Sequence, residues 1–169
     1  MTASAEIIKG YIPGAIGRIS ELHGAYYHKH WGFGLFFEAK VATELSEFLM
    51  RYDAEKDGIW VASQDGRIEG AIVMDGIHAE TDGAHLRWFI LSDTLRGKGV
   101  GRTLVKKAMA FCRAKNYRKA HLWTFEGLDA AKRLYEEAGF RLVRQKRGIQ
   151  WGTEVNEQYM EADLGETTS

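Results

Sequence analysis

Apolar residues recur at three- and four-residue spacing in four segments of the chain. The first two segments, residues 16–30 and 35–52, are separated by residues 31–34, where two glycines interrupt the pattern. The other two segments are residues 99–115 and 128–138. Because this spacing gives a helix one apolar face, the pattern predicts four amphipathic helices that pack on a core.

Shorter segments rich in β-branched and aromatic residues predict strands. Residues 58–64 and 67–74 flank Asp65-Gly66, a dipeptide that favours a two-residue hairpin turn because both positions tolerate positive φ. The remaining predicted strands are 6–12, 84–91, 119–124, 140–144 and 155–164. The order β-α-α-β-β-β-α-β-α-β-β has hairpins first and a strand-helix-strand crossover later. It predicts an α/β fold of the α+β type with a mixed sheet.

The third predicted helix begins in a glycine-rich turn. Gly97, Gly99 and Gly101 alternate with other residues, so backbone N–H groups can converge on a bound group. The first turn of a helix has N–H groups without partners inside the helix and the positive end of the macrodipole, which favour an anion by about 0.3 to 2 kcal/mol. Positive side chains surround the glycines: Arg96, Lys98 and Arg102. We therefore predict a phosphate-binding loop.

The spacing of the glycines distinguishes this loop from two other phosphate motifs. The run G-x-x-x-x-G-K-[ST] is absent from the sequence, and G-x-G-x-x-G fails because Arg102 or Leu104 stands where the third glycine is needed. The pattern R-x-x-G-x-G at 96–101 resembles the pyrophosphate loop of the GNAT acetyltransferase family. The segment LYEEAGF at 134–140 is similar to the one that these enzymes carry on their last helix. The first two predicted helices, including residues 23–27 and 37–38, also resemble the acetyltransferase half of MarR-GNAT fusion proteins.

This resemblance implies a GNAT-like, mostly antiparallel mixed sheet of six or seven strands flanked by about four helices. It also implies an N-acetyltransferase that moves acetyl from acetyl-CoA to a primary amine of a small molecule or peptide by direct attack in a ternary complex, without a metal. Tyr135 matches the residue that often protonates the departing thiolate. The coenzyme-binding residues that the resemblance implies are Phe89, Ile90, Leu91, Arg96, Gly97, Lys98, Gly99, Val100, Gly101 and Arg102.

One departure from the family pattern leaves a second function open. Leu128 stands seven residues before Tyr135, where many members have an asparagine that contacts pantetheine. A non-catalytic module that binds or senses acyl-CoA would keep the phosphate loop and need no base. Both functions predict coenzyme binding, but only the enzyme releases free CoA when an amine is supplied.

Acetylation of an amine needs a neutral nitrogen, which an alkyl amine of pKa about 10.4 supplies at a cost of about 4 kcal/mol at neutral pH. His85 is the candidate base, since the resemblance places it near the position where histone-type members have a glutamate early in the equivalent strand. An ordinary histidine pKa of about 6.5 also suits the task. A solvent-facing structural histidine is the alternative. Glu38 and Glu126 are competing carboxylates, whereas Trp123 stands where another branch of the family has its glutamate.

The acceptor pocket is expected between the two early helices and the sheet. Tyr26, Trp31 and Glu38 are its candidate residues, with Phe36 nearby and Trp151-Gly152 closing it from the other side. Core packing is the alternative use of these aromatic residues. Three residues of the first helix share a face that could suggest a metal, but they lack an acidic ligand, so we expect no metal site: His23, Tyr27 and His30.

Composition narrows the partner and the compartment. Lys plus Arg and Asp plus Glu are both 23, so we expect neither nucleic acid nor an anionic membrane as a partner. The single cysteine, Cys112, leaves no pair for an internal disulfide. Without a leader pattern or an apolar run of about 18 residues, we predict a cytoplasmic protein. We expect one domain over 1–164 and a disordered tail at 165–169, with a homodimer as one option.

Overall fold

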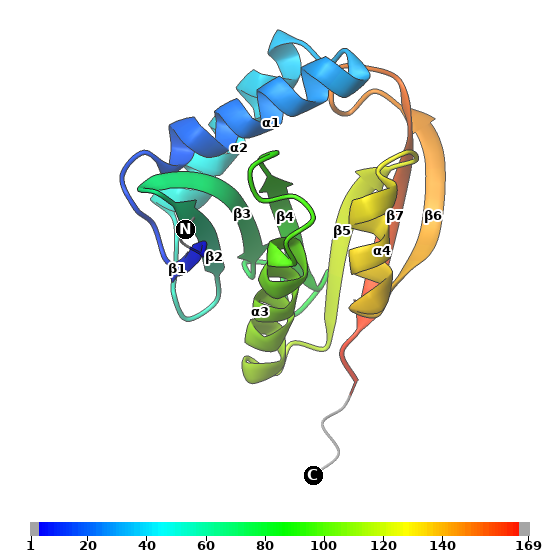
Figure 1. Ribbon diagram of the computed structural model, residues 1–169. Helices are drawn as coiled ribbons and strands as arrows, with labels where there is room; N and C mark the ends of the chain where they lie inside the picture. Colours follow the sequence, from blue (N-terminus) through cyan, green and yellow to red (C-terminus); the bar gives the residue numbers. More distant parts are fainter. Residues whose placement is uncertain (1–3, 166–169) are drawn as a thin grey trace.

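The helices and strands follow one another in the predicted order (Figure 1). The computed structural model describes residues 4–165, so most of the predicted tail lies outside the described residues. The elements are β1 (Glu6–Lys9), α1 (Ala15–Trp31), α2 (Leu35–Met50), β2 (Gly58–Gln64), β3 (Arg67–Asp75), β4 (Ala84–Leu91), α3 (Val100–Ala114), β5 (Lys119–Phe125), α4 (Asp129–Glu137), β6 (Phe140–Gly148) and β7 (Val155–Asp163). The predicted fold class is confirmed.

Two predicted strand ends differ from the structure by three or more residues, and the ends of β3, β5 and β7 differ by one residue each. β1 stops at Lys9 instead of residue 12, because Gly10 has a φ of 110° and turns the chain out of the extended conformation. β6 continues past residue 144 to Gly148, which pairs with Val155 of β7. Of the added residues, 145–147 are polar and exposed, so no apolar pattern marked them as a strand.

The strands form one sheet that opens in its middle. Within residues 4–165 the order is β1-β2-β3-β4-β5-β7-β6, and every neighbouring pair is antiparallel except β4 with β5. This parallel pair holds its register at Ala84 with Ala120 and at His85 with His121. Beyond these residues β4 and β5 diverge, as Figure 1 shows. The opening lies at the carboxyl ends of both strands, where the glycine loop and α4 begin.

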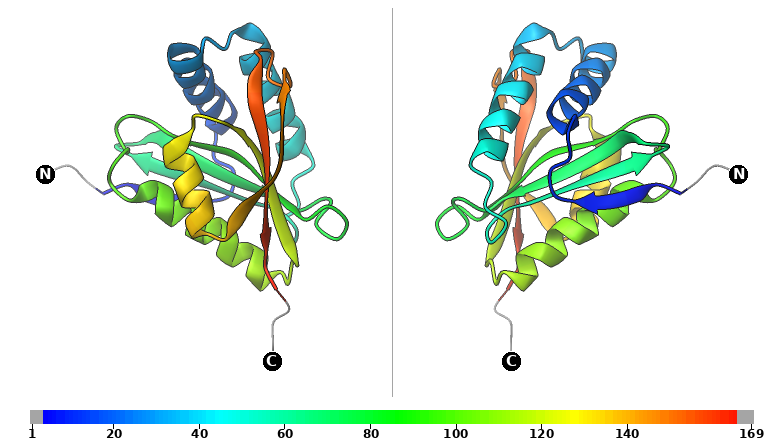
Figure 2. Two further views of the ribbon diagram at one scale, coloured as in Figure 1. Left: turned by 90° about the vertical axis from the view of Figure 1, so that its right-hand side faces the viewer. Right: turned by 90° about the vertical axis from the view of Figure 1, so that its left-hand side faces the viewer.

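The helices cover both faces of the sheet (Figure 2). Leu104 and Met109 of α3 pack with Ile72 of β3 in one buried cluster. On the other face, Phe48 of α2 packs with Val73, the next residue of β3, in a second cluster. The alternation of side chains along a buried strand explains why successive residues belong to different clusters. A third cluster, of Phe33, Phe37, Val41, Phe125 and Val155, joins the start of α2 to the second half of the sheet.

A bulge in β4 changes which face its side chains occupy. The register with β3 skips one residue, so Trp88 and Phe89 together lie opposite Ile72. Trp88 has a φ of 47°, which is uncommon for a large side chain. Arg87 and Trp88 therefore both face α2, whereas Phe89 packs with the α3 cluster. Bulges of this kind re-aim side chains beside sites, and here the bulge lies at the opening of the sheet.

Candidate active site

The glycine loop adopts a backbone that only glycine takes easily. Gly97 and Gly99 have φ values of 77° and 80°, and Gly99 caps α3 with no side-chain hydrogen bond. A side chain in this left-handed region costs about 1 to 2 kcal/mol per residue. The loop therefore presents the first-turn N–H groups of α3 without a capping side chain, as a bound anion requires.

Gly101 joins the loop to the rest of the site. A Cβ at this position would lie 3.1 Å from side-chain carbons of both Leu91 and Leu134, and 3.3 Å from the ring of Phe89. The start of α3 thus packs closely on the end of β4 and on α4. A bound molecule that extends from the loop along β4 would pass Phe89 directly.

Two arginines beside the loop have partners within the chain. Arg96 donates a hydrogen bond of 2.8 Å to the carbonyl oxygen of Leu91, and its guanidinium lies 4.5 Å from the ring centre of Tyr26. Arg102 donates to both carboxylate oxygens of Glu137, at 2.9 and 3.0 Å. Arg102 is consequently oriented toward α4. Lys98 is exposed, and Val100 begins the helix.

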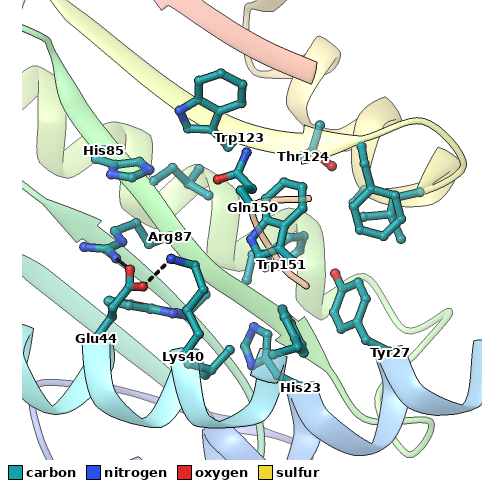
Figure 3. Close-up of a pocket in the computed structure, with 18 of the residues that line it drawn as sticks. His23, Tyr27, Lys40, Glu44, His85, Arg87, Trp123, Thr124, Gln150 and Trp151 are labelled. Atoms are coloured by element: carbon teal, nitrogen blue, oxygen red, sulfur yellow. Dashed lines mark hydrogen bonds and ion pairs between the residues drawn. The ribbon is translucent and has the colours of Figure 1, made fainter. Parts of the chain in front are cut away.

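A cavity of about 180 Å³ occupies the opening between β4 and β5 (Figure 3). Its walls come from α1, α2, β4, β5, α4 and the turn between β6 and β7. Aromatic rings form one part of the lining: Phe37, Trp88, Trp123, Phe125 and Trp151. Polar side chains form another part: Lys40, Glu44, His85, Arg87 and Gln150. The cavity thus has room for a small polar molecule against apolar walls.

The structure brings some of the predicted site residues to this cavity. His85, Phe89 and Tyr135 line it, and so does Leu128. Phe89 connects the cavity to the loop, since its ring centre is 6.0 Å from that of Tyr135 and it also packs against Gly101. Ile90 instead packs in the core beneath α1 and α2.

The three predicted acceptor residues lie outside the cavity lining. Tyr26 stacks with Arg96 beside the loop, and Trp31 packs edge to face on Phe125 with ring centres 4.9 Å apart. Glu38 lies over Gly24 and lines a separate hollow on the outer side of α1 and α2. The competing carboxylate Glu126 is exposed at the end of β5. Helical spacing in the sequence predicts which residues share a face of a helix. It does not predict which face lies against the cavity, and this is why the acceptor residues were wrongly expected to line it.

Tyr135 lies where the loop and the cavity meet. Its side chain is buried on α4 between the rings of Phe89 and Phe140. Burial raises the pKa of Tyr135 well above its usual range, and the neighbouring Tyr27 adds to the shift. The hydroxyl therefore keeps its proton at neutral pH and can donate a hydrogen bond into the cavity.

Two histidines of the cavity are neutral at physiological pH. Burial, together with His121 and Arg87, lowers the pKa of His85 to about 3, and its ring stacks on that of His121 with centres 4.4 Å apart. Burial lowers the pKa of His23 to about 4. The Nδ1–H of His23 donates to the carbonyl oxygen of Ile19 at 2.8 Å, which leaves Nε2 as the acceptor nitrogen. Both rings are weaker bases than an ordinary histidine.

The polar part of the lining is a chain of ion pairs that the sequence did not predict. Lys40 pairs with one carboxylate oxygen of Glu44, and Arg87 donates to the other at 2.7 Å. Arg87 also donates to Asp75 at 3.2 Å, and Asp75 accepts two hydrogen bonds from Arg51. The i,i+4 spacing of Lys40 and Glu44 was the available sequence signal. No local sequence pattern predicted Arg87 beside them, because its position depends on the bulge in β4 and on the opening of the sheet.

Within residues 4–165, no group of three or more His, Cys, Asp or Glu side chains could hold a metal ion. None of the helices in that part of the chain has the length and apolar character needed to cross a membrane.

Comparisons with known proteins place this geometry among acetyltransferases. The model of the acetyltransferase (GNAT) family matches residues 18–140. The human N-acetylaspartate synthetase is 30% identical over 118 residues, which are 69% of this chain and 38% of that protein. The chain thus spans well under half of that relative's length.

Solved structures share the fold over almost the whole chain. A GNAT family acetyltransferase from Staphylococcus aureus Mu50 has a TM-score of 0.76 at 18% identity and covers 96% of this chain and 100% of its own. A GNAT superfamily phosphinothricin acetyltransferase from Sinorhizobium meliloti, solved in complex with AcCoA, has a TM-score of 0.71 at 20% identity, covering 98% and 91%.

Proposed function

Because this chain belongs to the acetyltransferase (GNAT) family, we propose that it transfers the acetyl group of acetyl-CoA to a primary amine of a small molecule or peptide, by direct attack in a ternary complex. The observation that carries the proposal is the continuity between the uncapped N-terminus of α3 and the cavity. Phe89 contacts both Gly101 at the loop and Tyr135 in the cavity wall. A carrier with a phosphate end and a reactive end fits such a path.

The residues of the loop suit the diphosphate of acetyl-CoA. The first-turn amides beyond Gly97 and Gly99 would bind its oxygens, with Arg96 and Lys98 nearby. The end of β4 at Phe89 and Leu91, which β5 leaves unpaired, would accompany the pantetheine arm. The family includes a structure solved with AcCoA, which supports this coenzyme. When bound, the coenzyme supplies the activated thioester.

Tyr135 is the proposed hydrogen-bond donor to the departing sulfur. A CoA thiol has an ordinary pKa of about 8.5, so its thiolate leaves readily and needs little help from an acid. A phenol whose pKa is raised by burial holds its proton firmly. Stabilising the developing negative charge by a hydrogen bond therefore suits Tyr135 better than complete proton transfer.

The proton of the amine has several acceptors in the cavity. His85 and His23 are neutral and have unprotonated nitrogens, and Glu44 is a carboxylate in the same wall. The lowered pKa of each histidine limits its strength as a base. We propose that the ammonium of the acceptor loses one proton to water before attack. The second proton, lost as the C–N bond forms and the thiolate leaves, passes to His85, the predicted base that lines the cavity.

The test is to mix the protein with acetyl-CoA and a panel of amines, and to detect free CoA thiol and the acetylated product. The panel should include aspartate, because a relative that matches over part of its length is an N-acetylaspartate synthetase. We expect turnover with at least one amine and loss of most of it in Tyr135→Phe. A protein that binds acetyl-CoA in calorimetry but acetylates no amine would contradict the proposal.

That outcome would favour a non-catalytic module that binds or senses acyl-CoA. The observation behind this second candidate is that both cavity histidines have lowered pKa values, with Leu128 lining the wall where many members carry asparagine. Such a module should bind acetyl-CoA equally well with Tyr135 or phenylalanine at that position.

A further inference from the structure

The polar wall of the cavity carries more positive than negative charge. Lys40 and Arg87 share the single carboxylate of Glu44, one cation on each oxygen. Behind this lining, Asp75 is shared by Arg51 and Arg87, and Asp57 and Glu47 add negative charge near Arg51. The histidines of the wall add no charge at neutral pH, because burial lowers their pKa values. Among the described residues, the charged ones that line the cavity are Lys40, Glu44 and Arg87, so the lining itself has one positive charge in excess.

This excess charge is only partly exposed to water. The side chain of Arg87 is 18% exposed, and those of Lys40 and Glu44 are each 32% exposed. A charge that is largely removed from water is costly unless a counter-charge or hydrogen bonds compensate it. A negatively charged group of a ligand would supply that compensation.

Both cations retain hydrogen-bond donors for such a group. Each terminal nitrogen of Arg87 uses one N–H in its contacts with Glu44 and Asp75 within residues 4–165, and each carries a second. The ammonium of Lys40 has three N–H groups and pairs with Glu44. Figure 3 shows the side chains of Lys40, Glu44 and Arg87 together at one side of the cavity, across from Tyr27 and Thr124. The two cations can therefore bind a second carboxylate beside that of Glu44.

We propose that the acceptor is a small amine that also carries a carboxylate, and that Lys40 and Arg87 bind this carboxylate. The inference rests on the proposed acetyl transfer and names its substrate class. The cavity volume of about 180 Å³ is shared with the acetyl end of the coenzyme, so the acceptor has the size of an amino acid. The guanidinium of Arg87 is also held 4.0 Å from the ring centre of Trp88, which fixes its position for recognition.

The charge of the wall also orients the acceptor. The two cations attract its carboxylate and repel its ammonium, so the amine end is directed away from the wall. The carboxylate of the acceptor would bind the wall while its amine points toward Phe89 and Tyr135. A diamine, in contrast, would bring a second cation to a wall that is already positive.

The experiment compares acceptors that differ only in the charge of one end. 4-Aminobutyrate, 4-aminobutyramide and 1,4-diaminobutane share a four-carbon chain with a primary amine at one end. The other end is a carboxylate, a neutral amide or a second primary amine, and alanine with alaninamide tests a shorter separation. With acetyl-CoA saturating, we expect kcat/KM for the better carboxylate acceptor to exceed that of its amide about tenfold or more, as a charge-assisted hydrogen bond would give. An equal or higher kcat/KM for the amides or the diamine would overturn the inference while leaving the proposed acetyl transfer intact.

Lys40→Met tests the contact itself. The side chain of Lys40 is partly exposed and belongs to none of the three buried clusters, so the variant should fold, and circular dichroism checks this. We expect KM for the carboxylate acceptor to rise about tenfold, with kcat and the kinetics of the amide changed far less. Lys146→Met, on the exposed face of β6, is the matched control and should keep the full preference. An unchanged preference in Lys40→Met would contradict the proposal.

A binding measurement decides the question even if no amine is acetylated. Calorimetry of 4-aminobutyrate and 4-aminobutyramide into the CoA-saturated protein should show a preference for the carboxylate that Lys40→Met abolishes. Equal affinities, or no binding of either compound, would overturn the inference. An absence of turnover in the presence of this preference would instead count against acetyl transfer alone.

Discussion

The two ends of the proposed site are built from different parts of the chain. The loop end presents main-chain N–H groups of consecutive residues, and its Gly97 and Gly99 have left-handed φ values. The proposed acceptor end presents side chains of α2 and β4 that form ion pairs with one another. Main-chain groups suit a coenzyme that never changes, whereas side chains can be exchanged to suit another acceptor. The difference indicates that coenzyme and acceptor recognition can be altered separately.

Tyr135→Phe should have the largest effect, because this residue lies between the two ends. Removing the hydroxyl takes away the donor to the departing sulfur but keeps the buried ring. We expect kcat to fall about 10- to 100-fold with little change in KM for acetyl-CoA, measured with the best acceptor. Tyr117→Phe, which loses a hydroxyl that donates to the Lys56 carbonyl remote from the cavity, is the control. Full kcat in Tyr135→Phe would exclude this role.

We expect acid to lower the free energy of unfolding through a histidine at the acceptor end, with no such contribution from the loop end. The pKa of His23 is about 4 in the folded chain, against about 6.5 unfolded. At a pH between these values the unfolded state binds a proton on His23 that the folded state does not bind. The contribution of His23 to the stability is therefore complete above about pH 6.5 and is lost as the pH falls toward 4. From pH 7 to 5 this amounts to about 2 kcal/mol.

Urea unfolding at pH 7 and pH 5 measures this loss. His23→Gln should remove about 2 kcal/mol of the pH dependence, because the amide side chain does not titrate. His30→Gln changes an exposed histidine of the same helix and serves as the control for exchanging a histidine there. Equal pH dependence in His23→Gln and the unmodified protein would show that this ring is not the titrating group.

At the loop end, Gly99→Ala should raise the Kd for acetyl-CoA about tenfold. The added Cβ lets the loop relax out of the left-handed region, and binding must then restore that conformation at a cost of about 1 to 2 kcal/mol. Gly66→Ala is a matched control, since Gly66 has a φ of 77° in the β2–β3 hairpin. Both variants should lose stability, but only Gly99→Ala should lose affinity in calorimetry. Equal affinities would mean that the loop does not hold the coenzyme.

Glu137→Gln should have the smallest effect and the opposite sign. It releases Arg102 from an exposed ion pair and removes a negative charge near the start of α3. We expect acetyl-CoA to bind about two- to threefold more tightly at low salt, in keeping with the small energies of exposed pairs, and the gain to shrink as salt is added. Glu136→Gln, an exposed neighbour, should show a smaller gain. Weaker binding of acetyl-CoA by Glu137→Gln would argue against an attraction between Arg102 and the coenzyme.

The sequence was sufficient for features that depend on neighbouring residues. The hairpin at Asp65-Gly66 and the glycine loop each follow from consecutive residues, and the structure contains both turns with positive φ. The helical spacing likewise predicted the four helices. In these cases local conformational preferences and the tertiary structure agree.

The acceptor end depends on distant residues, and the sequence was insufficient there. The bulge at Trp88 shifts the alternation of β4 by one residue, so Arg87 and Trp88 share a face that a regular strand would have separated. The i,i+4 spacing of Lys40 and Glu44 in the sequence indicated that they could pair. The contact of Glu44 with Arg87 depends instead on how α2 crosses the sheet. For the same reason Tyr26, Trp31 and Glu38 were expected at the cavity, whereas the structure places them beside it.

The central claim is that main-chain groups at the start of α3 bind the diphosphate of acetyl-CoA while the cavity beside Tyr135 carries out acetyl transfer. The most direct measurement is kcat/KM for one amine acceptor with acetyl-CoA and with S-acetylpantetheine, which has the same thioester but lacks the diphosphate. The claim predicts turnover with both and a preference of about 30-fold or more for acetyl-CoA, the upper range of an anion at a helix N-terminus. Equal kcat/KM for the two thioesters, or no turnover with either, would contradict it.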